Sequence, residues 1–208
     1  MCVICVSDYG VKQPTKTTMQ TMWTNNPHGA GYMYYRDGKV YTRKGFMKFT
    51  DFWNAVSSEG FTEDDVVAYH FRISTQGGVN PEMTQPFFFT KDIVKTKELA
   101  GEAKLGIMHN GIIQMTSDGN KEYSDTAQFV ADYLPLIIRN TKDLDNERKT
   151  DIIRELIKSR MVFLDCRGKV TLVGDFVQEK DGLIYSNKTY KPYKPYAYYG
   201  GGYLQSIM

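Results

Sequence analysis

The sequence predicts an α+β protein built on antiparallel sheets. Short β-branched runs are interspersed with stretches of helical spacing, and their order lacks the strict strand–helix–strand alternation of a parallel sheet. Asp37-Gly38 separates the strand-like segments 31–35 and 39–43, and Asp-Gly is one of the preferred two-residue hairpin turns. At 208 residues the chain can bury a core of its own without disulfides or metals.

Each element rests on a local pattern. Runs of β-branched, aromatic and other apolar residues predict strands at 2–7, 31–35, 39–43, 66–73, 105–108, 112–115, 161–166, 170–176 and 183–185. Helical spacing and capping residues predict helices at 15–24, 50–58, 124–138 and 144–159. Pro27 is expected to stop the first helix, Thr50 to open the second and Ser124 to cap the third. The His109-Asn110-Gly111 segment is expected to be the turn between strands 105–108 and 112–115.

Composition argues against several classes of partner. The chain has 26 Lys and Arg against 24 Asp and Glu, and a net charge of +2 predicts neither nucleic acid nor a membrane surface as partner. The three cysteines, Cys2, Cys5 and Cys166, form no disulfide framework, which favours a reducing compartment and a cytoplasmic location. No run reaches the roughly 18 apolar residues of a membrane span. The histidines lack metal-ligand spacing and no phosphate-loop motif is present, so neither metal nor cofactor is expected.

The composition changes at Lys188. The segment 188–208 contains a tandem Lys-Pro-Tyr, three consecutive glycines and six of the chain's 15 tyrosines, and it has no core pattern. Such a composition is typical of segments that do not form a packed core by themselves. We therefore expect residues 188–208 to be a flexible or partner-ordered tail.

Cys2 is the first candidate for chemistry because it follows Met1. A small side chain at this position normally leads to removal of the methionine, which leaves the thiol beside a free α-amine. That amine has a reference pKa of about 7.7–8.0, so it can accept the thiol proton near neutral pH. One residue then supplies both nucleophile and base. The alternative is that Cys2 and Cys5 are small apolar residues of a buried strand, and for Cys2 taken alone this alternative is the stronger.

Other polar residues offer what an amide-hydrolysing site needs. The side-chain amide of Asn110 and the backbone N–H of Gly111 can converge on a developing oxyanion, although Asn-Gly equally signals a plain hairpin turn. Arg72 interrupts an apolar strand and needs an anion, and a guanidinium matches an α-carboxylate. Asp125 could receive an ammonium group, although the helix dipole also favours an acidic residue there.

The motifs, taken together and in this order, resemble the class II glutamine amidotransferases of the N-terminal-nucleophile hydrolase superfamily. The similarity is strongest to small stand-alone members, including ones found in bacteriophages, and it covers residues 2–187. The matching motifs are Met1-Cys2, Asn26-Pro27-His28-Gly29-Ala30-Gly31, His70-Phe71-Arg72-Ile73-Ser74-Thr75 with Gly77-Gly78, Gln85-Pro86-Phe87, His109-Asn110-Gly111-Ile112-Ile113 and Ser124-Asp125-Thr126. Each motif is weak alone, whereas the ordered set with the cysteine at position 2 is specific.

The resemblance implies a fold, an activity and a role for each residue. The fold would be a four-layer αββα sandwich of two stacked antiparallel sheets, with a glutamine amidotransferase domain at 2–187. The implied activity is release of ammonia from glutamine through a thioester, for transfer by a partner synthase. The implied roles are nucleophile and base for Cys2, oxyanion hole for Asn110 and Gly111, α-carboxylate binding for Arg72, α-ammonium binding for Asp125, and lining of the glutamine pocket for Thr75 and Gly77. A viral member would act in the cytoplasm of its host.

The chain departs from the family pattern at several positions. Val3 stands where members usually have Gly, His28 where Asp is common, and Gln76 and Gln85 where many have His. These departures leave two alternatives open. One is a hydrolase of a different γ-glutamyl amide, and the other is a weakened or inactive binding or structural protein on the same scaffold.

Overall fold

The computed structural model describes residues 2–74, 78–116 and 122–192. Within these residues every strand pair is antiparallel, so the predicted α+β class with antiparallel sheets is confirmed. The larger sheet contains, in spatial order, β10 (Val177–Gln178), β11 (Ile184–Tyr185), β1 (Val3–Ser7), β4 (Val67–Phe71), β2 (Ala30–Arg36), β3 (Lys39–Phe46) and β6 (Ala100–Ala103). The smaller sheet contains β5 (Phe87–Phe88), β7 (Leu105–Asn110), β8 (Arg160–Asp165) and β9 (Val170–Val173).

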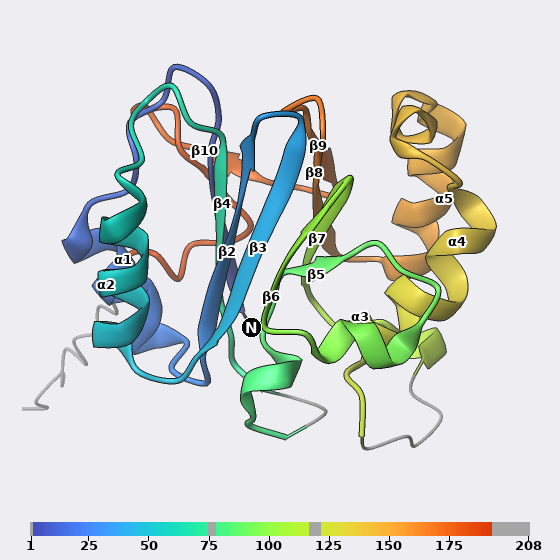
Figure 1. Ribbon diagram of the computed structural model, residues 1–208, viewed down its shortest axis with the longest axis horizontal. Helices are drawn as coiled ribbons and strands as arrows, with labels where there is room; N and C mark the ends of the chain where they lie inside the picture. The colour runs from blue at the N-terminus through green and yellow to red at the C-terminus, as the bar shows by residue number, and fades with distance from the viewer. Residues whose placement is uncertain (1, 75–77, 117–121, 193–208) are drawn as a thin grey trace, which may run out of the picture.

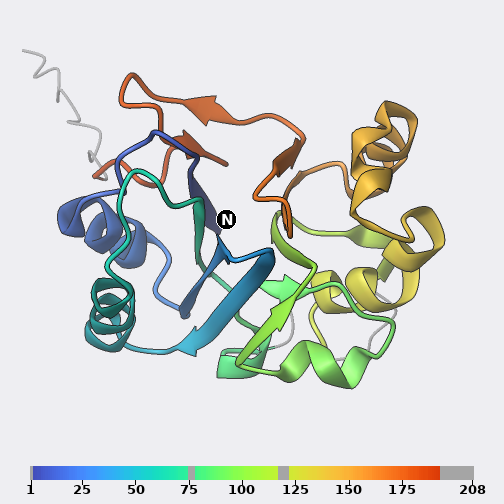
Figure 2. The ribbon, with the colours of Figure 1, turned by 45° about the horizontal axis from the view of Figure 1, so that its top comes forward.

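Helices cover the outer face of each sheet (Figure 1). The larger sheet is covered by α1 (Lys16–Asn25) and α2 (Phe49–Glu59), and the smaller by α3 (Asp125–Gln128), α4 (Leu134–Ile137) and α5 (Glu147–Ile157). Short helical turns complete the connections: η1 (Pro81–Met83), η2 (Ile93–Lys97), η3 (Gln114–Thr116), η4 (Phe129–Tyr133) and η5 (Thr141–Asp145). The two sheets thus lie between two layers of helices, an order that Figure 2 shows from a second direction and that is compatible with a sandwich.

Three apolar layers hold these elements together. The alternation of side chains along a strand determines which layer each strand residue joins. On β1, Val3 and Cys5 pack toward α1 and α2, whereas Ile4 and Val6 lie between the sheets together with Met108 of β7. A third layer joins the outer face of the smaller sheet to α3, α4 and α5. Because successive side chains of a strand point to opposite faces, the position of a residue along β1 determines which face of the sheet it lies on.

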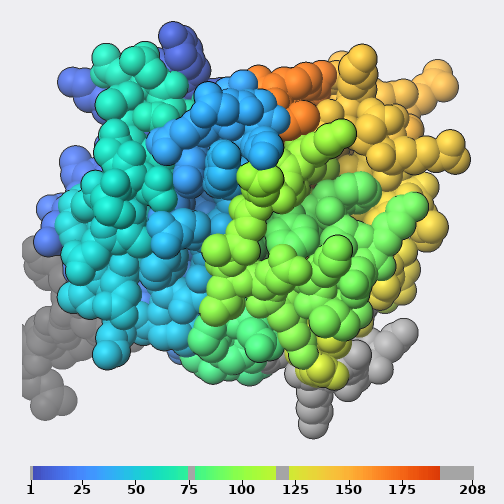
Figure 3. Space-filling view, in the orientation of Figure 1, coloured from blue at the N-terminus to red at the C-terminus, as the bar shows by residue number. Residues whose placement is uncertain are grey.

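The chain crosses between the sheets through β6. This strand pairs with β3 in the larger sheet and is followed after a single residue by β7 of the smaller sheet. The surfaces of β3 and β6 therefore meet on the face shown in Figure 3. This short connection fixes the end of the smaller sheet against the larger one.

The predicted hairpin and helices are largely confirmed, with two corrections. Asp37 and Gly38 both have positive φ, 50° and 75°, as the tight turn between β2 and β3 requires. Helix α2 begins at Phe49 with Lys48 as its N-cap, so the cap predicted at Thr50 is wrong. Phe49 packs against the apolar layer under the helix, which is the contact that places the helix start one residue earlier.

The strand predicted at 112–115 is also wrong. Gln114–Thr116 is a 3-10 turn, and the backbone N–H of Ile113 donates to a carboxylate oxygen of Asp125 at 2.7 Å, not to a neighbouring strand. The apolar character of this segment comes from Ile113, which is buried among the helices of the smaller sheet. The Asn110-Gly111 step is therefore the end of a strand and not a hairpin turn.

Packing continues past the tail boundary predicted at residue 188. The ring of Tyr190 is 8% exposed and stacks on Tyr185 with centroids 3.7 Å apart. Its hydroxyl donates to Glu179, which also pairs with Lys191 at 3.0 Å. The folded region thus includes Tyr190, while residues 193–208 lie outside the described part of the chain. Within the described residues no helix has the length and apolar character needed to cross a membrane.

Candidate active site

Strand geometry brings the predicted site residues to one end of the space between the sheets. Val3 of β1 pairs with Phe71 of β4, so Cys2 and Arg72, one residue further on each strand, are neighbours at the same sheet end. Alternation places both on the inter-sheet face, because Ile4 lies there. Asn110 is the last residue of β7 and shares its face with Met108, which also lies between the sheets.

A cavity of about 260 Å³ lies at this end of the sheets. Its described lining consists of Cys2, Ile73, Asn110, Gly111, Ile112, Lys158, Ser159 and Arg160. The thiol and the predicted oxyanion residues, which are more than 100 positions apart in the sequence, therefore share one cavity. A nucleophile and a pair of N–H donors around one cavity are the minimum arrangement for acyl transfer.

The Cys2 thiol is held by the backbone that follows β4. The N–H of Ile73 donates to Sγ at 3.3 Å, and Sγ lies 3.4 Å from the carbonyl oxygen of the same residue. Burial raises the pKa of the thiol above its ordinary value, and the Ile73 N–H and the charge of Arg72 partly oppose this shift. The resting group is therefore a thiol, and it needs a base close by to become a nucleophile.

The amide of Asn110 is anchored at one end and unpaired at the other. The side chain is fully buried, and its Nδ2 donates to Ser186 Oγ at 2.8 Å. Ser186 Oγ also accepts from the backbone N–H of Ile4 at 2.8 Å, which ties β1 to the end of β7. The Oδ1 atom has no hydrogen-bond partner among the described residues. The side-chain oxygen of Asn110 is thus without a hydrogen-bond partner in the part of the chain that the structure describes.

Gly111 is required by the close approach of its neighbours. A Cβ built on this residue would lie 2.3 Å from Cβ and 2.7 Å from Oγ of Ser159. Non-bonded carbon atoms normally approach no closer than about 3.5 Å, so no side chain fits here. Gly111 and Ser159 both line the cavity beside Cys2.

Gly111→Ala is expected to destabilise the protein by about 1–3 kcal/mol, the usual cost of overpacking. Chemical denaturation of wild type, Gly111→Ala, Ser159→Gly and the double variant forms a cycle that isolates this contact. Because Ser159→Gly removes the two atoms that the new methyl group meets, Gly111→Ala should cost less in that background, with a coupling of at least about 0.5 kcal/mol. Equal costs in both backgrounds would show that the steric account is wrong.

His109 is held by three hydrogen-bond contacts next to the Asn110-Gly111 segment. Its Nδ1 is 2.9 Å from Thr126 Oγ1, its Nε2 is 2.7 Å from Ser159 Oγ, and its backbone N–H donates to Gln85 Oε1 at 2.6 Å. Burial lowers the pKa of His109 to about 4, so the ring is neutral near pH 7. Gln85, a departure from the family pattern, thereby supports the end of β7 through its own side chain.

Arg72 and Asp125 are both buried and lie within electrostatic reach of each other. Arg72 is 4% exposed and its Nη1 donates to the carbonyl of Gly78 at 2.7 Å, while Asp125 accepts from the backbone N–H of Ile113 and of Thr126, each at 2.7 Å. Burial lowers the pKa of Arg72, and the charges of Cys2 and Asp125 oppose this effect. Neither Arg72 nor Asp125 lines the cavity beside Cys2.

The loop that follows Arg72 is held by His28. The backbone N–H of His28 donates to Arg72 O at 2.9 Å, and His28 Nδ1 accepts from the backbone N–H of Ser74 at 2.9 Å. The imidazole of His28 thus serves as a hydrogen-bond acceptor for this loop. The predicted pocket residues Thr75 and Gly77 come directly after Ser74 and lie outside the described residues.

Two residues that support the site were not predicted from the sequence. Ser186 anchors Asn110, and Asn187 Nδ2 donates to the carbonyl oxygen of Cys2 at 2.6 Å. Both follow β11, which pairs with β1, so the end of the described chain holds both halves of the site. A serine and an asparagine after a short strand carry no local signal of such a role, because their partners are 76 and 185 positions away.

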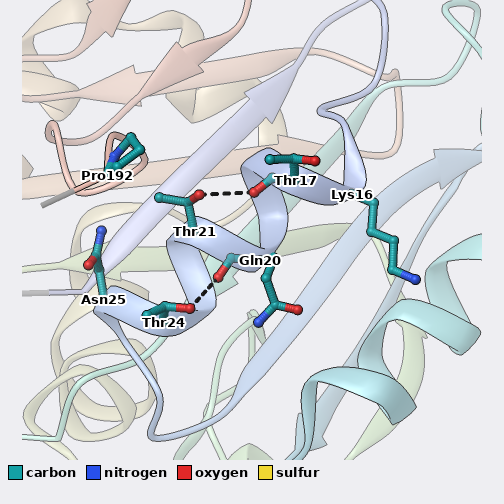
Figure 4. Close-up of a pocket in the computed structure, with 7 residues that line it drawn as sticks. All are labelled: Lys16, Thr17, Gln20, Thr21, Thr24, Asn25 and Pro192. Atoms are coloured by element: carbon teal, nitrogen blue, oxygen red, sulfur yellow. Dashed lines mark hydrogen bonds between the residues drawn. The ribbon is translucent and has the colours of Figure 1, made fainter.

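A second groove lies outside this site. It measures about 530 Å³ and runs along the exposed face of α1 beside Pro192 (Figure 4). Thr21 and Thr24 donate to carbonyl oxygens of their own helix, and Lys16 is the one charged residue in the described lining. The groove therefore offers no combination of nucleophile, base and oxyanion donors.

The described residues contain no group of three or more His, Cys, Asp or Glu side chains arranged to hold a metal ion. The described lining of the cavity beside Cys2 includes the thiol of Cys2, the amide of Asn110, the hydroxyl of Ser159 and the cationic side chains of Lys158 and Arg160. In comparisons with known proteins, no family model and no curated protein sequence matched the chain.

Proposed function

We propose that the chain is a cysteine amidohydrolase of the class II glutamine amidotransferase type, with the corresponding N-terminal-nucleophile fold. It would release ammonia from glutamine in the cytoplasm and supply it to a partner synthase. The observation that carries this proposal is the single cavity lined by Cys2 and by the Asn110-Gly111 segment. A free thiol, an amide with an unpaired polar atom and a close-packed glycine are the groups that such chemistry uses.

The first half of the reaction forms a thioester. After loss of Met1, the α-amine of Cys2 accepts the thiol proton, and Sγ attacks the carbonyl carbon of the substrate amide. The raised pKa of the thiol makes this neighbouring base necessary. The C–N bond then breaks, the protonated α-amine gives its proton to the departing nitrogen, and ammonia leaves. Water hydrolyses the thioester and releases glutamate.

Asn110 and Gly111 would stabilise the oxyanion of both tetrahedral intermediates. In the orientation described above, Ser186 Oγ accepts from two N–H groups, and its own proton finds no acceptor on Asn110. Rotation of the Asn110 amide by 180° lets Ser186 donate to Oδ1 and leaves Nδ2 as the unpaired atom. That rotation converts the unpaired acceptor into the donor that an oxyanion requires.

Arg72 and Asp125 would bind the amino-acid end of the substrate. A guanidinium matches a carboxylate, and the buried Asp125 side chain, which accepts from two backbone N–H groups, could in turn meet an ammonium group. Their burial and mutual electrostatic contact support a zwitterion site, because each charge partly compensates the other when no substrate is bound.

A glutamine-mimicking diazoketone provides the most direct test. Incubation should add one inhibitor mass to the protein, and peptide mapping should place the adduct on Cys2, with Met1 absent from the intact mass. The free thiol of Cys166 serves as an internal control and should remain unmodified. Well-folded protein that retains Met1, or that reacts at Cys166 as readily as at Cys2, would contradict the proposal.

A further inference from the structure

Two cations line the cavity beside Cys2, and the proposed glutamine chemistry gives neither of them a role. They are Lys158, which ends α5, and Arg160, which begins β8. No described residue forms an ion pair with either side chain. Because the departing amide nitrogen takes up a proton and leaves as small, uncharged ammonia, two positive charges beside Cys2 have no evident function for glutamine itself.

The backbone keeps Lys158 at the cavity despite a conformational cost. Lys158 has φ 46° and ψ 33°, the left-handed conformation that Gly or Asn usually supplies at the end of a helix. Its N–H closes the helix by donating to the carbonyl of Arg154 at 2.9 Å. A residue with a side chain is less favourable than glycine in this conformation. The chain therefore places a cation where glycine would serve the fold better.

Arg160 is oriented by one contact that leaves most of its guanidinium available. Its Nε donates to the carbonyl oxygen of Asp175 at 2.6 Å, and its Nη atoms have no partner among the described residues. Arg160 pairs with Asn110 across β7 and β8, so its place beside the oxyanion residue is set by the sheet register. Ser159 lies between the two cations and is fixed through Oγ to His109.

The cavity is separate from the site proposed for the glutamyl end of the substrate. Arg72 and Asp125, which would hold the α-carboxylate and α-ammonium groups, are absent from its lining, whereas Cys2 and Asn110 are present. A substrate amide on Cys2 has an acyl side and an amine side. If the acyl side occupies Arg72 and Asp125, this cavity is left for the amine side.

We infer that the site accepts, in addition to glutamine, γ-glutamyl amides of small amino acids, whose carboxylate binds Lys158 and Arg160. This inference rests on the proposed amidohydrolase function and names its substrate class. A cavity of about 260 Å³ is below the roughly 300 Å³ at which pockets for drug-sized ligands begin, a size that suits a glycine-sized group. Ammonium-type and guanidinium donors are the usual partners of a carboxylate.

The reaction balances as a hydrolysis. Cys2 Sγ forms a bond to the γ-carbonyl carbon, the bond from this carbon to the amine nitrogen breaks, and the nitrogen takes the proton that the α-amine of Cys2 had accepted. The free amino acid leaves past Lys158 and Arg160. Water then cleaves the thioester, so that one γ-glutamyl amide and one water give glutamate and an amino acid.

The test compares two substrates that differ in a single charge. γ-Glutamylglycine carries the carboxylate, and γ-glutamylethylamide has a neutral group of similar length. For wild-type protein kcat/KM should be at least about tenfold higher for γ-glutamylglycine, and this ratio should fall about tenfold in Lys158→Met and in Arg160→Met, as expected for loss of one charged contact. Arg148→Met, an exposed cation at the other end of α5, should leave the ratio unchanged. A wild-type ratio near one, or a ratio that Lys158→Met and Arg160→Met do not alter, would overturn the inference.

A binding measurement separates this inference from the proposed function. Calorimetry with Cys2→Ala, which cannot react, should show tighter binding of γ-glutamylglycine than of γ-glutamylethylamide, and Lys158→Met in that background should abolish the difference. Charge-dependent binding without turnover by wild type would refute the amidohydrolase reaction and retain the carboxylate site. Turnover of glutamine without any charge preference would retain the reaction and refute the carboxylate site.

Discussion

Cys2→Ala is expected to abolish release of glutamate and ammonia from glutamine while leaving the fold intact. Loss of the nucleophile costs on the order of 10⁶ in kcat in a protease whose residues act as a unit, so activity should fall to the background rate. Stability should change little, because the substitution removes one small side chain whose hydrogen-bond contacts among the described residues are with the backbone of Ile73, at 3.3 and 3.4 Å. Glutaminase assays and thermal denaturation of the purified variant measure the two outcomes.

Cys166→Ala is the matched control for this experiment. Cys166 is also a free, half-buried cysteine, and it follows β8 at the strand end opposite to Arg160, which lines the cavity. Its replacement should leave activity unchanged. More than a few per cent of wild-type activity in Cys2→Ala, or a large loss in Cys166→Ala, would show that Cys2 is not the nucleophile.

Asn110→Ala is expected to lower kcat by about 10²–10³ with little change in KM. This is the usual effect of removing one oxyanion donor, because the donor acts on the transition state more than on the bound substrate. Ser186 contacts the fully buried Asn110 amide and also binds the N–H of Ile4, so in the rotated orientation proposed above the amide would be held in place before substrate arrives. Steady-state kinetics with glutamine give both parameters.

Two further variants make the Asn110 result interpretable. Asn54→Ala removes an exposed amide from α2 and should leave kcat unchanged. Ser186→Ala keeps Asn110 but removes its anchor, so it should lower kcat by less than Asn110→Ala does. A rise in KM at constant kcat in Asn110→Ala would assign this residue to substrate binding and contradict the oxyanion role.

Much of the fold follows from local patterns because the pairing partners are close in sequence or strongly periodic. Asp37-Gly38 predicts the β2–β3 hairpin, since both residues tolerate positive φ. The apolar runs at β1 and β4 predict buried central strands, and these pair with each other. The same reasoning wrongly predicts a strand at 112–115. An apolar run that is buried by helices has the same composition as a strand.

Some residues of the candidate site can likewise be selected from the sequence, and others cannot. Cys2, Arg72 and Asn110 can be selected from the sequence because each residue type carries recognisable chemistry. Ser186, Asn187 and Arg160 cannot, since their roles depend on partners brought together by sheet register. The stacking of Tyr190 on Tyr185 likewise extends the packed region beyond what composition indicates.

The sequence by itself determined the α+β class, the antiparallel hairpins and the identity of the reactive groups, because turn chemistry, strand periodicity and side-chain reactivity are local properties. Only the tertiary structure decided that Cys2 and Asn110 share one cavity, that Ser159 requires Gly111, and that Lys158 and Arg160 line the same cavity. These contacts join residues that lie far apart in the sequence, and their geometry is set by the packing of two sheets against each other, which no local pattern encodes.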